Sequence, residues 1–284
     1  MKPRSRFSRR KFLAVVGGSL VGAAVYSRWI EPGWLGVGRP TLKLARRTLS
    51  SPVKVLQLSD LHASDVVPLE FIARAVRLGL KEQPDLVLLT GDFITGRFAR
   101  FNDYAKVLRP LSEQVPCFAT LGNHDGGRWA AARKGYEDTE NVRELLTLSG
   151  ISLLHNQSAE LRVQGSAIRL VGLGDAWARE FSPQTAFTAR TADDKSPVFV
   201  LSHNPDTKDE LRDYDWDVMF CGHTHGGQLQ IPLVGAPFAP VRDKRFLKDL
   251  HSWEGRWIYI TKGVGNLLGC RFNCRPEISL ITVA

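Results

Sequence analysis

The stretch VKVLQLSDLH, residues 53–62, joins a short apolar segment to an Asp-x-His pair that follows it directly. A short apolar run bounded by polar residues predicts a buried β-strand over 53–58. One Asp-x-His pair is more often part of a capped turn than a pair of metal ligands. The role of Asp60 and His62 therefore depends on whether the same pattern recurs elsewhere in the chain.

The pattern recurs four times. Further strands are predicted over 85–90, 115–121, 197–201 and 218–220, ending at TGD, LGNHD, SHNP and CGHTH. Apolar residues at helical spacing predict helices over 69–82, 101–114 and 137–149. The remaining strand-like runs are 159–163 and 167–173, which predict an antiparallel hairpin, and 257–261 and 278–283. Strands that alternate with helices predict an α/β fold.

Each of the five strands ends in a cluster of Asp, Asn or His. In α/β folds, ligands bind beyond the carboxyl ends of the strands, so clusters from distant parts of the chain predict one convergent site. Five of the seven histidines fall in these clusters. The candidate site residues are Asp60, His62, Asp92, Asn123, His124, His203, His223 and His225.

The residue types at this site point to metal chemistry. Carboxylates, imidazoles and an amide oxygen, with no obligatory thiolate, suit Mn²⁺, Fe or Zn²⁺. Seven candidate ligands are too many for one tetrahedral zinc ion. They suit two divalent metal ions that share one carboxylate.

The ordered motifs SDLH, TGDF, LGNHD, LSHNP and CGHTHGGQ resemble those of the calcineurin-like metallophosphoesterases. The N-terminal signal, EPGW near residue 31 and the ending CRPEISLITV resemble the exported bacterial YaeI/YkuE-type phosphodiesterase subgroup in particular. The resemblance implies a four-layer α/β/β/α sandwich with the metal site at the carboxyl ends of the strands. It also implies a dinuclear metal-dependent phosphohydrolase, most specifically a phosphodiesterase.

The resemblance assigns a role to each candidate. Asp60, His62 and His225 would hold one metal ion, and Asp92 would bridge both ions. The second ion would be held by Asn123, His203 and His223. A hydroxide that bridges the ions would attack phosphorus in line, while His124 would stabilise the phosphoryl oxygens or protonate the leaving group. Thr95 and Asp125 stand where phosphoprotein phosphatases of this superfamily carry acidic residues, Glu in the case of Asp125, which argues against a Ser/Thr protein phosphatase.

Two other functions remain open. Related calcineurin-like proteins are UDP-2,3-diacylglucosamine pyrophosphatases of lipid A biosynthesis, and a lipid-linked substrate would suit aromatic and basic residues near the N-terminus. An export signal fits poorly with that cytoplasmic substrate. The alternative of another class is a non-catalytic protein that binds metal or the cell envelope, which would leave His124 without an evident role.

The N-terminus predicts export. SRRKFL, residues 8–13, precedes an apolar run over 12–26 and resembles a twin-arginine signal. We expect a signal or membrane anchor over 1–30, a basic juxtamembrane linker over 31–52, and the phosphoesterase domain over 53–284. Cleavage and retention of the signal both remain open. The expected location is the periplasm or the outer face of the inner membrane, anchored or peripheral, with the twin-arginine machinery and the membrane surface as partners.

Charge argues against a nucleic-acid partner. The chain carries a net charge of +9, but residues 1–30 hold seven basic residues and no acidic one. From Asp60 onward, 26 basic residues face 28 acidic ones, so the domain offers no basic binding face. We expect a monomer that acts on a phosphoester substrate.

Several other residues near the motifs carry expectations. Asp125 could orient His124 or cap a turn, and we expect the cap. Cys117 and Cys221 are expected to face the core. Cys270 and Cys274 leave a disulfide open. For Arg97, Arg128 and Arg271 we expect solvated surface positions, although each lies near a motif or the C-terminal loop and could contact a phosphate.

Overall fold

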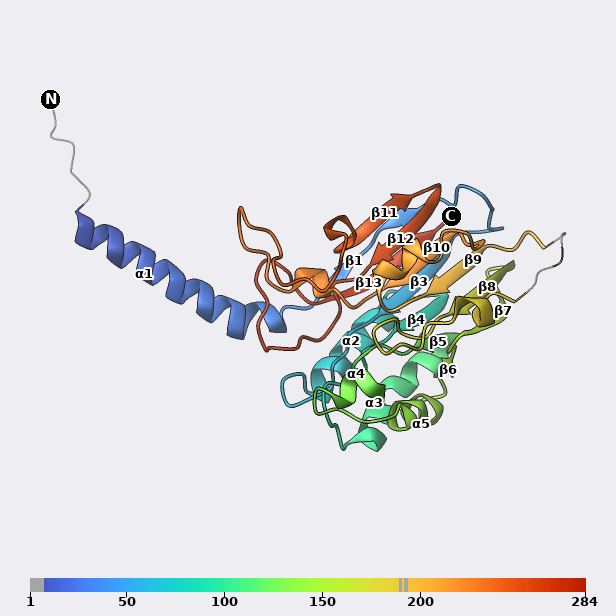
Figure 1. Cartoon of the computed structure of the whole chain (residues 1–284), viewed down its shortest axis with the longest axis horizontal. Coiled ribbons are helices and arrows are strands. Elements are labelled where there is room, and N and C mark those ends of the chain that lie inside the picture. The colour runs from blue at the N-terminus through green and yellow to red at the C-terminus, as the bar shows by residue number, and fades with distance from the viewer. Residues whose placement is uncertain (1–7, 189–190, 192–193) are drawn as a thin grey trace, which may run out of the picture.

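The computed structural model describes residues 8–188, 191 and 194–284, so residues 1–7 of the predicted signal lie outside it. Two β-sheets lie face to face in the domain (Figure 1). The first sheet has the order β1 (Gly36–Gly38), β13 (Glu277–Val283), β3 (Val53–Leu58), β4 (Leu86–Thr90), β5 (Cys117–Thr120) and β6 (Ser152–Leu153), and β2 (Thr41–Leu42) also pairs with β13. The second has the order β11 (Asp249–Trp253), β12 (Arg256–Ile260), β10 (Val218–Cys221), β9 (Val198–Leu201), β8 (Ser166–Gly172) and β7 (Gln157–Val163).

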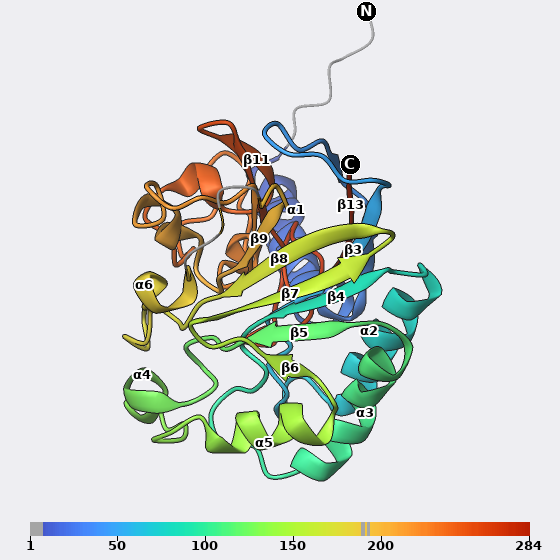
Figure 2. The same ribbon diagram turned by 90° about the vertical axis from the view of Figure 1, so that its right-hand side faces the viewer.

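Three apolar layers hold these elements together. The first lies between the first sheet and the helices that cover it, α2 (Leu69–Lys81), α3 (Phe101–Gln114) and α5 (Glu140–Leu148) (Figure 2). The second lies between the sheets, where Leu86 and Leu88 of β4 join Phe199 and Phe220 in one buried cluster. Alternate residues of these buried strands point to opposite faces, so each strand feeds two apolar layers.

The third apolar layer covers the outer face of the second sheet. Trp216 and Phe246 pack there against Val200 and Met219 of the sheet. The α/β/β/α sandwich is thus confirmed, but its fourth layer contains short pieces only. These pieces are α6 (Pro183–Ala186), the 3₁₀ turns Pro205–Asp209 and Lys244–Phe246, and connecting loops.

Parallel pairing brings the functional strand ends together. β3, β4 and β5 are parallel neighbours in the first sheet, and β9 and β10 are parallel neighbours in the second. The predicted hairpin is confirmed, because β7 and β8 pair in antiparallel fashion from Gln157↔Gly172 to Val163↔Ser166. The carboxyl ends of the five strands that precede the motifs therefore lie at the same end of the sandwich.

Some elements differ from the sequence-based prediction. The helix expected over 137–149 begins at Glu140, and α4 (Gly127–Ala131), β6 and β11 were not predicted. The segment 31–52, expected to be a linker, contributes β1 and β2, which pair with β13 at the edge of the first sheet. Both strands are too short to show an apolar alternation, and only their pairing with β13 defines them.

The N-terminal segment forms a long helix that projects from the domain. It comprises α1 (Arg9–Val25), drawn in blue in Figure 1, and continues as a π-helical turn over Tyr26–Ile30. No residue of α1 is buried. The stretch Arg9–Gly33 is the one helix among the described residues whose length and apolar composition suffice to cross a bilayer. A signal sequence would satisfy the same criterion, so cleavage and retention both stay open.

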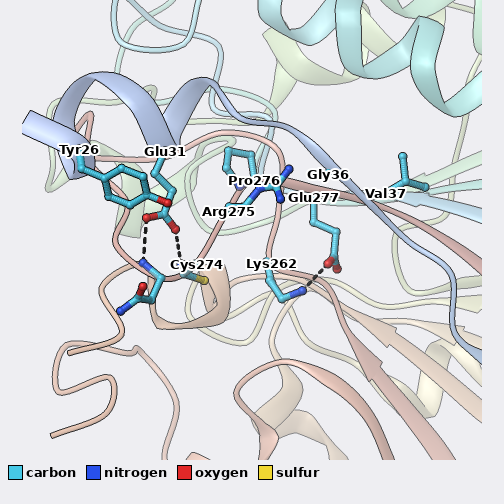
Figure 3. Close-up of a pocket in the computed structure, with 10 residues that line it drawn as sticks. Tyr26, Glu31, Gly36, Val37, Lys262, Cys274, Arg275, Pro276 and Glu277 are labelled. Atoms are coloured by element: carbon cyan, nitrogen blue, oxygen red, sulfur yellow. Dashed lines mark hydrogen bonds and ion pairs between the residues drawn. The ribbon is translucent and has the colours of Figure 1, made fainter. Parts of the chain in front are cut away.

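Glu31 fastens the inner end of this helix to the domain. Its side chain is fully buried, and its carboxylate accepts hydrogen bonds from the backbone N–H groups of Asn273, at 2.8 Å, and Cys274 (Figure 3). Glu31 lines a cavity of about 450 Å³, and Lys262 and Glu277 form an ion pair on its other side. The start of the predicted linker is therefore part of the folded domain.

We expect Glu31→Ala to lower the free energy of unfolding by about 1–3 kcal/mol, because two backbone N–H groups would lose their acceptor. Thermal unfolding of the full chain in detergent measures this change. Glu113→Ala, at an exposed position of α3, is the matched control. An equal shift in both variants would contradict the role of Glu31.

Candidate metal centre

The seven predicted ligands lie directly beyond the carboxyl ends of five strands. Asp60 follows β3, Asp92 follows β4, Asn123 follows β5, His203 follows β9, and His223 follows β10. Like these five, His62 and His225 are buried. Residues from both sheets thus converge on one site.

The backbone at this site is strained. Five candidate ligands have positive φ angles between 49° and 69°, namely Asp60, His62, Asp92, His223 and His225. Residues other than glycine rarely adopt this left-handed conformation, and it occurs preferentially at functional sites. Here it turns the chain sharply after β3, β4 and β10, so that side chains two or four residues beyond each strand end reach the centre.

The first group of converging side chains comprises Asp60, His62 and His225. The Nε2 atoms of His62 and His225 lie 3.0 Å apart. The Oδ1 atom of Asp60 lies 3.4 Å from Nε2 of His225 and 3.9 Å from Nε2 of His62. Three ligand atoms that face one another at this spacing match the donor set of a divalent cation.

The second group comprises Asp92, His203 and His223. Nε2 of His203 lies 3.1 Å from Oδ2 of Asp92 and 3.2 Å from Nδ1 of His223. The same Asp92 oxygen lies 3.6 Å from Nε2 of His62, which belongs to the first group. One carboxylate oxygen is therefore shared between the two groups.

Asn123 and His124 flank the shared carboxylate. The Oδ1 atom of Asn123 is buried and has no hydrogen-bond partner among the described residues. A buried amide oxygen without a partner is costly and usually has a specific explanation. The backbone N–H of His124 donates to Oδ1 of Asp92 at 2.8 Å, which fixes the carboxylate orientation. The orphaned amide oxygen therefore fits a cation at this centre.

Burial sets the protonation of the imidazoles. It lowers the pKa of His62 and of His223 to about 3, and it lowers the pKa of His225 well below its usual range. A neutral imidazole has a lone pair available for a metal. Burial opposes charge on His203, but the nearby Asp92 raises its pKa well above the usual value. Burial also raises the pKa of Asp60 to about 7. Bound cations would replace the protons that the raised pKa values favour on Asp60 and His203.

Hydrogen bonds outside the two groups orient the imidazoles. Nδ1 of His203 lies 2.7 Å from the carbonyl oxygen of Thr90, so it donates there and turns Nε2 toward Asp92. Nδ1 of His62 lies 2.7 Å from the hydroxyl of Thr95. Such contacts fix the ring orientation of metal-binding histidines. Thr95, the residue that replaces an acid in the second motif, therefore supports His62.

Comparison with known proteins bears on the same residues. Residues 53–227 match the family model described as calcineurin-like phosphoesterase. This chain belongs to the calcineurin-like phosphoesterase family. The match begins at the first residue of β3 and ends at Gly227, the last residue of the CGHTHGG stretch, so it spans all five motifs.

The phosphoesterase is also similar to individual relatives. It is 42% identical to "Phosphodiesterase YaeI" of Escherichia coli, covering 96% of this chain and 98% of that protein. It is 30% identical to "UDP-2,3-diacylglucosamine pyrophosphatase LpxG" of Chlamydia trachomatis, covering 90% of this chain and 92% of that protein. It is 29% identical to metallophosphoesterase YkuE of Bacillus subtilis, covering 98% of each chain.

Asp125 clamps two loops of the phosphoesterase. Its buried carboxylate accepts hydrogen bonds from the backbone N–H groups of Asp92, Phe93 and Gly122 at 2.6–2.9 Å. The expected turn-capping role is confirmed for Gly122, since that bond closes the third motif. The bonds to the second motif were not expected, and they hold Asp92 next to Asn123.

Arg271 corrects one prediction. We expected a solvated arginine, but its side chain is fully buried. Its guanidinium donates to the carbonyl oxygens of Lys262, Gly263, Gly265 and Cys274, and Nη2 lies 3.5 Å from Nδ1 of His225. The carbonyl acceptors compensate the loss of hydration of the buried charge. The sequence around Arg271, which follows a glycine-rich stretch, does not reveal this burial. Arg97 and Arg128 are exposed as expected.

An aromatic wall beside the site was not predicted. Trp129 packs on His124 with ring centroids 4.6 Å apart, and Trp177 packs on His223 at 4.3 Å. Trp177 is partly exposed, so its ring borders the centre on the solvent side. Neither tryptophan lies in a motif; Trp129 is in α4 and Trp177 is in a loop, and only the fold brings them together.

The cysteines agree with the predictions that the structure can test. Cys117 and Cys221 are buried in apolar clusters, and neither belongs to a group of converging ligands. Cys270 and Cys274 are free thiols in the structure. The Cys274 Sγ lies 3.1 Å from the carbonyl oxygen of His225, so this thiol supports the last motif.

Gly222 allows the loop after β10 to approach the loop after β3. A Cβ atom at Gly222 would lie 2.0 Å from Oγ of Ser59 and 2.4 Å from Oδ2 of Asp60. We expect Gly222→Ala to displace Asp60, to lower the metal content of the purified protein, and to lower its melting temperature. Elemental analysis and thermal unfolding measure these effects.

Gly33→Ala is the matched control, because a Cβ atom there would meet nothing within 4 Å. Full metal occupancy in the Gly222→Ala protein would show that the metal centre tolerates separation of the two loops. It would contradict the role of their close approach in placing Asp60.

Proposed function

We propose that this phosphoesterase is a phosphodiesterase that uses two divalent metal ions, with Mn²⁺, Fe and Zn²⁺ as the candidates. The observation that carries the proposal is the position of Asp92. Its Oδ2 atom lies 3.1 Å from His203 in one group and 3.6 Å from His62 in the other. A carboxylate shared between two ligand groups is the arrangement of two-metal hydrolytic sites. The 42% identity to a named phosphodiesterase supports the same activity.

The residues would divide the metal ions between them. Asp60, His62 and His225 would hold one ion, and His203, His223 and Asn123 the other, with Asp92 as the shared ligand. When bound, the two ions would supply the Lewis acidity that activates water and neutralises charge on the phosphoryl oxygens. Thr90, Thr95 and Asp125 would keep these ligands oriented through the contacts described above.

His124 would act on the substrate instead of on a metal ion. Its ring packs against His62 at 5.0 Å and Trp129 at 4.6 Å between centroids, while its backbone is tied to Asp92. This position leaves a ring nitrogen to donate a hydrogen bond to a phosphoryl oxygen or to pass a proton to the leaving oxygen. Such a group typically contributes about 10²–10⁴-fold in rate.

We expect His124→Ala to lower kcat on bis-p-nitrophenyl phosphate by about 10²–10⁴-fold while metal content stays unchanged. The assay uses the full chain with added Mn²⁺, and elemental analysis accompanies it. His251→Ala, at a histidine on β11 outside the site, is the control. A metal-loaded wild-type protein that fails to turn over any diester with Mn²⁺, Fe²⁺ or Zn²⁺ would refute the proposed activity.

UDP-2,3-diacylglucosamine is the second candidate substrate. The 30% identity to LpxG over 90% of this chain favours it. The same assay is run with this nucleotide lipid and with bis-p-nitrophenyl phosphate. It separates the two activities, because a pyrophosphatase releases UMP from the nucleotide lipid. Turnover of the simple diester alone would exclude the second candidate.

We infer that the chain is exported by the twin-arginine route and works at the outer face of the inner membrane or in the periplasm. Ser8 caps α1 by accepting from the backbone N–H of Lys11 at 3.2 Å, so Arg9 and Arg10 begin the helix. Replacing both by lysine is expected to leave the protein in the cytoplasmic fraction, which cell fractionation and immunoblotting measure. Unchanged export of that variant would refute this route.

A further inference from the structure

Two loops near the metal centre are fastened to the inner end of α1. The first, residues 267–273, receives a hydrogen bond at Gly269 O from Arg28 (3.2 Å) and donates one from Arg271 N to Ser27 O (2.9 Å). Phe272 of this loop also packs edge-on against Tyr26. The loop is therefore fixed next to the point where the long apolar helix meets the domain (Figure 1).

The second loop, residues 228–240, is fastened to the first. Gln230 N donates to Phe272 O at 2.8 Å, and Phe272 N donates to Gln228 O at 3.0 Å. Both loops lie beside the inner end of α1, where Figure 1 shows them in orange and red. The position of the helix thus fixes the position of both loops.

The tips of these loops expose large apolar side chains. Leu233 is fully exposed, Phe238 is 76% exposed and Leu268 is 72% exposed, and Val234 accompanies them. We call these four residues the loop surface. Exposed apolar residues gathered in one place mark a contact with a membrane or a partner. Trp29, Ile30 and Trp34 at the end of the helix are exposed as well, and aromatic residues of this kind suit the bilayer interface.

An apolar pocket is lined both by residues of the loop surface and by one proposed metal ligand. Its volume is about 380 Å³, within the range of pockets that bind small ligands. Leu229, Phe238, Leu267 and Leu268 line it, together with His225. A chain held in this pocket would have one end at the loop surface and the other beside a proposed metal ligand.

We propose that the loop surface lies against the bilayer that holds α1, and that the pocket takes the acyl or alkyl chain of a membrane phosphodiester. This inference rests on the proposed function and narrows its substrate class to lipid phosphoesters. A lipid is the occupant because the apolar helix and the loop surface share one side of the domain. In the reaction, water forms a new P–O bond, the ester P–O bond breaks, and the released alcohol takes a proton, with no change in oxidation state.

The first test compares two soluble diesters, methyl and hexyl p-nitrophenyl phosphate, with the full chain in lipid nanodiscs and Mn²⁺. Burial of the additional methylene groups is expected to raise kcat/KM for the hexyl ester at least about tenfold. Phe238→Asn and Leu268→Asn should reduce this preference to about twofold or less. Leu148→Asn, at a partly exposed leucine at the end of α5 on the far side of the domain from α1, should keep it.

The outcomes separate the two proposals. Turnover of both esters at equal kcat/KM, or a preference that survives both pocket variants, would overturn the lipid substrate and leave the phosphodiesterase intact. If neither ester is turned over, both the phosphodiesterase activity and the lipid substrate are overturned.

The second test measures membrane contact without activity. Leu233→Trp and Leu148→Trp each add one tryptophan to the full chain, which is reconstituted in bilayers that contain brominated phosphatidylcholine. The added emission, taken as the difference from the parent protein, should be quenched at least about twofold at position 233 and remain unquenched at position 148. Equal quenching at both positions would overturn the membrane contact. So would the finding that the protein is a dimer that Leu233→Asp dissociates, because the loop surface would then contact a second copy of the chain.

Discussion

The two halves of the metal centre depend on how the Asp92 carboxylate is held. Its Oδ1 atom accepts from the backbone of His124, and its Oδ2 atom faces His203 and His62. The backbone N–H of the same residue donates to Asp125, which also binds Gly122. The carboxylate therefore cannot rotate without breaking contacts to three of the five motif loops. β4 lies between β3 and β5, so its loop ends between the loop that carries Asp60 and the loop that carries Asn123.

This arrangement requires a backbone that the sequence alone would disfavour. Five ligands adopt left-handed conformations, each at a cost on the order of 1 kcal/mol. Buried side-chain to backbone bonds offset that cost, since Asp125 holds the second loop and the Asp60 carboxylate accepts from the backbone N–H of His223. Most of these bonds join different motifs. The strained turns are consequently stable only when the whole set is assembled, and the loss of one loop should loosen the others.

The sequence predicts the parts of this molecule that depend on short segments. The strand over 53–58, the helix over 101–114 and the five polar clusters were identified because local apolar patterns decide them. The convergence of the clusters followed from the rule that parallel strands end at one edge. The buried roles of Arg271 and Glu31 and the position of Trp177 were not predicted, because they depend on partners elsewhere in the chain. Glu31, for instance, meets Asn273 and Cys274 more than 240 residues later. A charged residue that the fold buries carries no local signal of its burial.

The contact of Glu31 also changes how the N-terminal helix relates to the metal centre. The backbone N–H of Cys274 donates to the Glu31 carboxylate, and its thiol lies against the carbonyl oxygen of His225. The backbone N–H of Arg271 donates to the carbonyl oxygen of Ser27, and its Nη2 donates to three carbonyl groups and lies 3.5 Å from Nδ1 of the same histidine. Two short paths of hydrogen bonds therefore connect the end of the helix to one proposed metal ligand. A helix that served only as a tether would need no contacts with the metal centre, whereas the end of this helix packs against residues that support His225. The orientation of the domain relative to the helix is fixed by the same residues that support the last motif, so the direction in which the metal centre opens is a property of the fold.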